Sequence, residues 1–154
     1  MNINLMEQQI SFRDIQLSDY NETKTILSFL TKQNEDFSFD SFTKLYSSLN
    51  SNHRIICCFY NDIEAETNTL VGIGTILIEY KLIHNCSCVG HIEDVAVHEK
   101  YRNMNFGKKL IDKLVTIAKE KYAYKVILNC TEENAGFYKK CGFHESNIEM
   151  RINI

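Results

Sequence analysis

Several features that mark other protein classes are missing from this 154-residue sequence. It contains no proline, an absence that excludes no class of function. No apolar run approaches the roughly 20 residues that a membrane-spanning helix needs. A net charge of −3 provides no overall positive field for nucleic acid or an anionic membrane. Residues 1–9 are polar and lack the apolar segment of a secretory signal. We therefore expect neither nucleic acid nor a membrane as a partner.

The six cysteines form no Cys-x-x-Cys pair, and this pattern favours reduced thiols in a cytoplasmic protein. Cys86 and Cys88, with His84 and His91 nearby, offer zinc ligands as an alternative. No second pair follows at the spacing of a structural zinc site, so we expect no metal.

The composition predicts a single globular domain, with 44% hydrophobic and 24% charged residues. We expect residues 1–9 to be flexible and residues 10–154 to form the domain. Apolar periodicity indicates an α/β (α+β) sandwich with a mostly antiparallel sheet. The expected strands are 10–16, 54–60, 70–80, 89–97, 125–128 and 143–152. The expected helices run from Ser18 or Asp19 to about residue 30, from 39 to 49 after a Ser38 cap, and over 107–121 and 133–140.

Two segments contain the candidate functional residues. In the first, Gly90–Val97 is a strand with adjacent carboxylates, and Tyr101–Leu110 is a polar turn that leads into a helix. The first amides of such a helix lack intrahelical partners and can bind a pyrophosphate. In the second, Asn129–Phe143 joins a strand end to a short helix with an aromatic pair, and Gly142 suits a left-handed cap after it.

Together, in this order and spacing, the two segments resemble the GNAT superfamily of acetyl-CoA-dependent N-acetyltransferases. Within it, they resemble the glucosamine 6-phosphate N-acetyltransferases, closely from about residue 70 onward and more loosely from residue 10. The resemblance implies a GNAT fold whose fourth and fifth strands splay apart around acetyl-CoA. It also implies a homodimer, with the last strand and the substrate pocket near the interface.

The resemblance assigns the cofactor site residue by residue. The expected acetyl-CoA contacts lie on the fourth strand, the turn and the short helix. They are Val95, Ala96, Val97, Arg102, Asn103, Met104, Asn105, Phe106, Gly107, Lys108, Asn134, Phe137, Tyr138 and Lys140.

Three residues match the catalytic positions of the family. Tyr138 is expected to assist departure of the coenzyme A thiolate, and Glu93 and Asp94 to accept the proton of the substrate ammonium. Because strand alternation places neighbours on opposite faces, both carboxylates reach one site only if a bulge intervenes. No protein nucleophile is needed, so Cys130 and Cys141 are interpreted as packing cysteines.

The sugar phosphate requires cations, and the resemblance points to Lys81, His84 and Arg151. Lys32, Lys44 and Arg54 are unranked further candidates. The chain departs from the family at Asn105, where glycine is common, and at Asn129, where an acidic residue is usual. Asparagine accepts left-handed geometry better than most residues. Asn129 cannot act as a base, so we assign it a role in orienting the substrate.

Two alternatives remain open at this stage. The first is a GNAT enzyme for another amine, which dependence on the 6-phosphate would distinguish. The second is a non-catalytic acyl-CoA-binding module, which saturable coenzyme A binding without turnover would favour.

Overall fold

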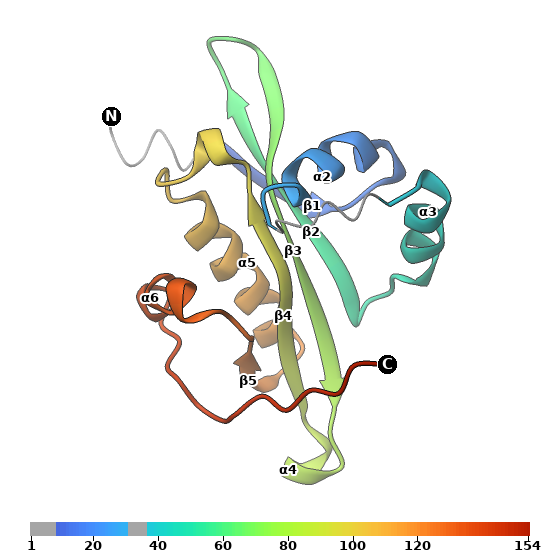
Figure 1. Ribbon diagram of the computed structural model, residues 1–154, viewed down its shortest axis with the longest axis vertical. Coiled ribbons are helices and arrows are strands. Elements are labelled where there is room, and N and C mark those ends of the chain that lie inside the picture. The colour runs from blue at the N-terminus through green and yellow to red at the C-terminus, as the bar shows by residue number, and fades with distance from the viewer. Residues whose placement is uncertain (1–8, 31–36) are drawn as a thin grey trace.

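The computed structural model describes residues 9–30 and 37–154 (Figure 1). The candidate cation Lys32 lies outside these ranges. Of residues 1–9, which we predict to be flexible, only Gln9 lies inside them. Strands are β1 (Ile10–Asp14), β2 (His53–Asp62), β3 (Thr67–Tyr80), β4 (Cys88–Val97) and β5 (Ala123–Ile127). Helices are η1 (Leu17–Asp19), α2 (Tyr20–Leu27), α3 (Phe39–Ser48), α4 (Ile83–Cys86), η2 (Glu99–Tyr101), α5 (Phe106–Glu120) and α6 (Glu132–Lys140).

The five strands form one sheet in the order β1-β2-β3-β4-β5. All neighbours pair antiparallel except β4 and β5, which are parallel. The β4–β5 pairing ends at His91 opposite Ile127, whereas β4 continues to Val97. The two strands therefore separate beyond His91, and the predicted fold with splayed fourth and fifth strands is confirmed.

Helices cover both faces of the sheet (Figure 1). α5 packs on β3, β4 and β5, and its buried side chains recur at helical spacing, as at Leu110, Leu114 and Ile117. On the other face, α2 and α3 contribute Ile26 and Phe42 to a second cluster of buried residues. The chain thus forms three layers, and β3, the middle strand of the sheet, contributes buried side chains to both cores.

Most predicted elements are present with shifted ends. Ser38 is the N-cap of α3, and its hydroxyl accepts a hydrogen bond from the Ser41 amide at 3.1 Å. The connection between β2 and β3 is short, because β2 extends to Asp62 and β3 begins at Thr67. The Asp62 carboxylate accepts hydrogen bonds from the two amides that follow Ile63, which stabilises a tight turn.

The strand predicted at residues 143–152 is absent, and this prediction is wrong for the single chain. The segment is irregular, and Ile148, Met150 and Ile152 are each at least 87% exposed. A strand that buries none of its apolar side chains gains too little to offset the conformational entropy of ordering. None of the described helices is long and apolar enough to cross a membrane.

Candidate active site

A β-bulge lies in the middle of β4, which is the condition for both predicted carboxylates to reach one site. Ile73 pairs with Ala96 and Thr75 with Glu93, so two residues of β4 stand opposite one of β3. Asp94 occupies the bulge with a left-handed φ of 50°. Glu93 and Asp94 are both exposed, whereas their flanking residues are buried or half-buried. The bulge therefore presents two consecutive carboxylates where regular alternation would bury one of them.

Beyond the bulge, no strand among the described residues pairs with β4 on its β5 side. The predicted cofactor residues Val95, Ala96 and Val97 occupy this stretch. Ala96 is buried toward α2 and α3, and Val95 and Val97 pack toward α5. The main-chain groups on the open side of β4 can therefore pair with an extended ligand as a missing strand would.

The turn before α5 is shaped by two asparagines in left-handed conformation. Asn103 has φ 64° and Asn105 has φ 68°, a geometry that asparagine adopts more readily than most residues. Asn105 is the N-cap of α5, its side chain makes no cap hydrogen bond, and its carbonyl accepts from the Lys109 amide at 3.1 Å. The amides of residues 106–108 thus begin a fifteen-residue helix without intrahelical acceptors, which suits a bound phosphate.

Helix α6 closes the other side of the opening. A Cβ at Gly107 would lie 3.2 Å from Cζ of Phe137, so glycine allows the Phe137 ring to approach the first turn of α5. Tyr138 packs against Phe137 and Phe143 with its ring half-buried. Of the other predicted contacts on α6, Asn134 lies in its first turn and Lys140 in its last, and both are exposed.

Tyr138 has an electrostatic environment that keeps its phenol protonated. Burial raises the pKa of Tyr138 above its ordinary value of 10.0. The thiols of Cys130 and Cys141 and the carboxylate of Glu93 raise this pKa further. The hydroxyl is therefore a proton donor near neutral pH, within electrostatic reach of the Glu93 carboxylate.

The profile of the "Acetyltransferase (GNAT) family" matches residues 12–143, which span the sheet, the turn and α6. The chain belongs to this family. It is 37% identical to the glucosamine 6-phosphate N-acetyltransferase of Candida albicans, over 95% of this chain and 97% of that protein. It is 34% identical to the enzyme of the same name from Arabidopsis thaliana, over 94% of this chain and 97% of that protein.

Solved structures agree with this assignment. The crystal structure of glucosamine-6-phosphate N-acetyltransferase from Arabidopsis thaliana has a TM-score of 0.80 and 29% identity, covering 94% of this chain and 97% of that one. A predicted acetyltransferase from Clostridium acetobutylicum, solved with acetyl-CoA, has a TM-score of 0.71 at 18% identity and shares the fold.

In this GNAT chain, two cations of the turn already have partners. Arg102 is exposed, and its guanidinium donates to the carbonyls of Val97 at 3.4 Å and Phe29 at 3.2 Å. Lys108 lies 2.8 Å from the Asp112 carboxylate on the same helix. Arg102 therefore ties the turn to β4 and to the segment after α2, and the Lys108–Asp112 pair is exposed enough to exchange for a phosphate.

The predicted substrate cations lie apart from the bulge along the chain. Lys81 forms an ion pair with Glu79, which also lies 2.7 Å from Nε2 of His91. His84 lies in α4 and stacks on Tyr124 with ring centroids 4.3 Å apart. Both residues lie in the β3–β4 connection, where a ligand can reach them. Their role in phosphate binding stays a prediction.

Two other predicted substrate residues are exposed. Asn129 lies two residues after Ile127, the last residue of the strand that borders the opening. Arg151 lies on the irregular C-terminal segment, 3.6 Å from the Glu149 carboxylate. Cys130 is exposed too, so the interpretation of this residue as a packing cysteine is wrong, whereas Cys141 is half-buried.

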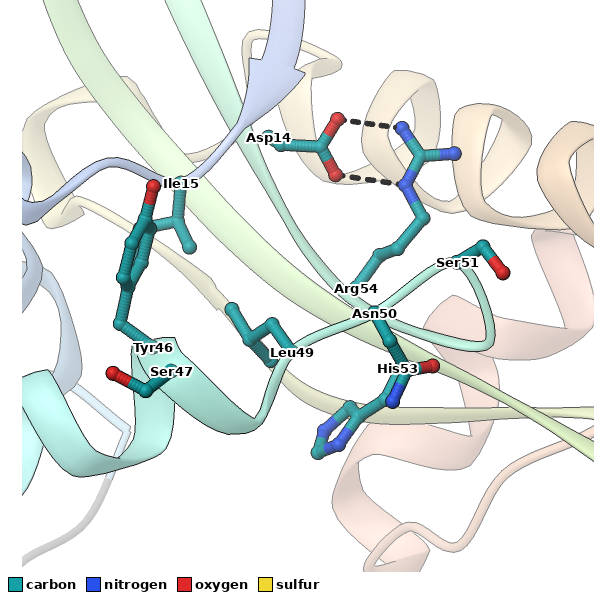
Figure 2. Close-up of a pocket in the computed structure, with 9 residues that line it drawn as sticks. All are labelled: Asp14, Ile15, Tyr46, Ser47, Leu49, Asn50, Ser51, His53 and Arg54. Atoms are coloured by element: carbon teal, nitrogen blue, oxygen red, sulfur yellow. Dashed lines mark hydrogen bonds and ion pairs between the residues drawn. The ribbon is translucent and has the colours of Figure 1, made fainter.

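A hollow of about 480 Å³ lies at the C-terminal end of α3 (Figure 2). Arg54 lies on its lining, and its guanidinium is turned to the Asp14 carboxylate, with two hydrogen bonds of 2.7 Å. Lys44, another candidate, lies 2.7 Å from Asp40 on the surface of α3. Arg54 and Lys44 thus each form an ion pair with a carboxylate, and their role in phosphate binding stays a prediction.

Sequence reasoning missed a second hollow, of about 240 Å³, between α2, α3 and the sheet. Asp94 lies on its lining together with Thr23 and Thr75, both buried. Threonine on an amphipathic helix carries no sequence signal of a site, so only the fold could reveal this arrangement. Among the described residues, no group of three or more His, Cys, Asp or Glu side chains could hold a metal ion.

Proposed function

We propose that this protein transfers the acetyl group of acetyl-CoA to the 2-amino group of D-glucosamine 6-phosphate, giving N-acetyl-D-glucosamine 6-phosphate. The observation that carries the proposal is full-length similarity to relatives named for this reaction, at 37% and 34% identity. The bulge with Glu93 and Asp94, and Tyr138 within electrostatic reach, supply chemistry that fits it.

The residues around the opening fit acetyl-CoA. The unpaired amides at the start of α5 suit its pyrophosphate, and exposed Lys108 adds a positive charge beside them. The open side of β4 at Val95–Val97 suits the amides of the pantetheine arm. Phe137, packed on Gly107 between these two regions, supplies an apolar wall.

The bulge carboxylates bind and deprotonate the substrate amine in our proposal. An amino sugar arrives mainly as an ammonium ion, which attracts Glu93 and Asp94 and must lose a proton before attack. Both carboxylates are exposed, so the proton can pass to either one or to water. Asn129, at the end of β5, orients the sugar because an amide can accept a hydrogen bond without acting as a base.

The transfer proceeds by direct attack in a ternary complex. The amine nitrogen bonds to the thioester carbonyl carbon while a β4 amide near Val95 stabilises the charge that develops on the carbonyl oxygen. The C–S bond breaks, and Tyr138 gives its proton to the departing thiolate. The raised pKa of Tyr138 keeps this proton in place until the thiolate forms.

The 6-phosphate is recognised by cations, and we propose Lys81, His84 and Arg151. All three side chains are exposed or half-buried. Lys81 and Arg151 form surface ion pairs with Glu79 and Glu149, and the His84 ring contacts the ring of Tyr124. Replacing a surface ion pair by a phosphate contact costs little, because exposed pairs are worth about 0–1 kcal/mol.

We further propose that the protein is a homodimer. Ile148, Met150, Ile152 and Ile154 alternate along the C-terminal segment, and each is at least 87% exposed. A row of apolar side chains at strand spacing, with no partner in the described chain, suits pairing with a second copy. Such pairing would also bring Arg151 toward the partner's substrate site.

A cytoplasmic location is proposed from the six free thiols, of which two are exposed. The product would then feed the synthesis of UDP-N-acetylglucosamine.

Release of the coenzyme A thiol tests the activity, with glucosamine 6-phosphate and glucosamine as parallel substrates. Turnover that depends on the 6-phosphate supports the proposal. Turnover without that preference favours a GNAT enzyme for another amine, and saturable binding without turnover favours a binding module. Parallel initial-velocity lines and an acetyl-cysteine intermediate would contradict direct transfer.

A further inference from the structure

An imidazole lies on the same face of β4 as the Glu93 carboxylate. His91 and Glu93 are two residues apart in the regular part of β4, before the bulge. Because strand side chains alternate between faces, both project from one face, about 7 Å apart along the strand. Ile92, between them, is buried on the opposite face in the core under α5. A proton can therefore pass between the two side chains directly or through one water molecule.

The imidazole also lies at the start of the opening between β4 and β5. His91 pairs with Ile127, the last pair before the two strands separate. Its side chain is 25% exposed, so solvent reaches the ring. Under the proposed function, on which this inference rests, the amine and the thioester meet just beyond that pair. His91 thus lies beside the place where the ammonium loses its proton, with access to bulk water.

The neighbouring strand determines which ring nitrogen can accept a proton. Nε2 of His91 lies 2.7 Å from a carboxylate oxygen of Glu79 on β3. A hydrogen bond donated by Nε2–H selects the tautomer in which Nδ1 carries the lone pair. Nδ1 makes no hydrogen bond within the described part of the chain. It is therefore the ring atom that remains able to take up a proton.

The charged side chains that face His91 come from β3, β4 and β5 and the residue that follows β3, whereas α5 covers the opposite face. They are Glu79, Lys81, Glu93, Asp94 and Lys125. Among the described residues, only Glu79 hydrogen-bonds to the ring. Hydrogen bonds from Lys81 and His91 hold the pKa of Glu79 below its ordinary value, so this carboxylate is charged at neutral pH. An anion in contact with the ring favours the imidazolium.

The chemistry of the site calls for such a group. Asn129 cannot accept the proton of the substrate ammonium, because its amide is not a base at neutral pH. Carboxyl groups ordinarily titrate near about pH 4 and imidazole near about 6.5. A base is most effective when its pKa lies near the operating pH, so imidazole holds an ammonium proton more readily than an exposed carboxylate does. The carboxylates of the bulge suit binding of the cation, and the imidazole suits storage of its proton.

We propose that His91 is the proton relay of this site. It receives at Nδ1 the proton that the substrate ammonium loses, through Glu93 or a water molecule, and Glu79 is its positioning residue. One ammonium N–H bond breaks and an Nδ1–H bond forms; the neutral amine then bonds to the thioester carbonyl carbon as the C–S bond breaks. A second proton leaves the nitrogen as the amide forms and replaces the one that Tyr138 gives to the thiolate. The partly exposed ring then returns its proton to water.

His91→Gln tests the relay through its pH dependence. Glutamine can donate a hydrogen bond to Glu79 as His91 does, but it cannot accept a proton. We expect kcat/KM for glucosamine 6-phosphate at pH 7 to fall about 10²-fold, and its rise between about pH 5.5 and 7 to become shallower. His53→Gln is the matched control, because His53 lies on the same face two strands away, and no described carboxylate hydrogen-bonds to its ring.

His91→Ala tests the same role by chemical rescue. Added imidazole can occupy the vacated space and accept the proton, so it should raise the turnover of this variant at least about tenfold. 1,2,4-Triazole has a ring of the same size but is a much weaker base, and it should not restore turnover. Neither compound should stimulate the wild type or His53→Ala. Thermal unfolding checks that all variants are folded.

The outcomes separate the relay from the proposed function. No turnover of glucosamine 6-phosphate by the wild type overturns both. Wild-type turnover with an unchanged kcat/KM, or an unchanged pH slope, in His91→Gln overturns the relay and leaves the proposed function standing. If imidazole and triazole restore folded His91→Ala equally, or neither restores it, the ring only fills space and the relay is overturned.

Discussion

Gly107 and Phe137 lie so close that a single added carbon on the glycine would press on the aromatic ring, at 3.2 Å from Cζ. This contact joins the first turn of α5, where the pyrophosphate is proposed to bind, to α6, which carries Tyr138. It thereby fixes the wall of the cofactor site relative to the leaving-group donor.

Gly107→Ala is expected to raise the KM for acetyl-CoA about three- to tenfold, because Phe137 must shift away from the cofactor site. Stability should change by less than about 1 kcal/mol, since alanine favours the helix while the contact is strained. Gly136→Ala is the matched control, because nothing lies within 4 Å of a Cβ there. Steady-state kinetics and thermal unfolding measure both effects, and an unchanged KM in Gly107→Ala would contradict the role of this contact.

Tyr138→Phe should lower kcat about 10²-fold, in the range of general acid catalysis, with little change in the KM for acetyl-CoA. Burial raises the pKa of Tyr138 above 10.0, so its proton is present below that value and is lost as the pH rises through it. The wild-type kcat should therefore show no decline due to this residue between pH 7 and 9.5. A wild-type decline in that range that disappears in Tyr138→Phe would contradict the raised pKa of Tyr138, and an unchanged kcat in Tyr138→Phe would contradict its role as proton donor.

Asp94→Asn and Asp94→Ala separate the chemistry of the bulge from its backbone strain. Both remove the carboxylate and should lower kcat/KM at pH 7 by about 10²-fold. Asparagine tolerates the left-handed φ of 50°, whereas alanine should cost about a further 1 kcal/mol of stability. Urea unfolding measures the difference between the variants. Equal stability of the two would mean that the bulge relaxes on substitution.

The sequence was sufficient to predict elements that depend on local patterning. Apolar periodicity predicts α5, the Ser38 hydroxyl predicts the start of α3, and the tolerance of asparagine for positive φ agrees with Asn105. Features that depend on distant segments could not be predicted. The hollow beside Thr23 exists only because α2 and α3 pack over β3 and β4. The segment at residues 143–152 alternates as a strand does, yet no described strand pairs with it.

Another relationship hidden from the sequence is the pair of partly exposed Arg13 and buried Asp19, whose two hydrogen bonds are 2.6 and 2.7 Å long. Burial raises the pKa of Asp19, but hydrogen bonds from Arg13 and the Gln16 amide outweigh this effect and leave the pKa below its ordinary value. The stability from this pair is therefore complete above the unfolded-state pKa of about 3.9 and is lost as the pH falls through the lower folded-state pKa.

Asp19→Asn should accordingly cost about 2–4 kcal/mol at pH 7 and weaken the loss of stability below about pH 4. Asp14→Asn is the matched control, because the Asp14 carboxylate is far more exposed than that of Asp19 and its pair with Arg54 should contribute about 0–1 kcal/mol. Denaturant unfolding at pH 7, 5 and 3.5 measures both. The same pH dependence in Asp19→Asn and the wild type would exclude this carboxylate as its source.

The C-terminal segment provides the last prediction. If Ile148, Met150, Ile152 and Ile154 pair with a second copy, Met150→Glu places a charge in an apolar interface and should shift the protein from dimer to monomer. Asn147→Glu is the matched control, because its side chain belongs to the alternate, polar row of the same segment. Light scattering after size-exclusion chromatography, over a hundredfold range of concentration, measures the mass. Because Arg151 is proposed to act across the interface, the monomeric variant should also show a raised KM for glucosamine 6-phosphate. A monomeric wild-type protein would contradict the dimer, and a dimer that persists in Met150→Glu would place the interface on another surface.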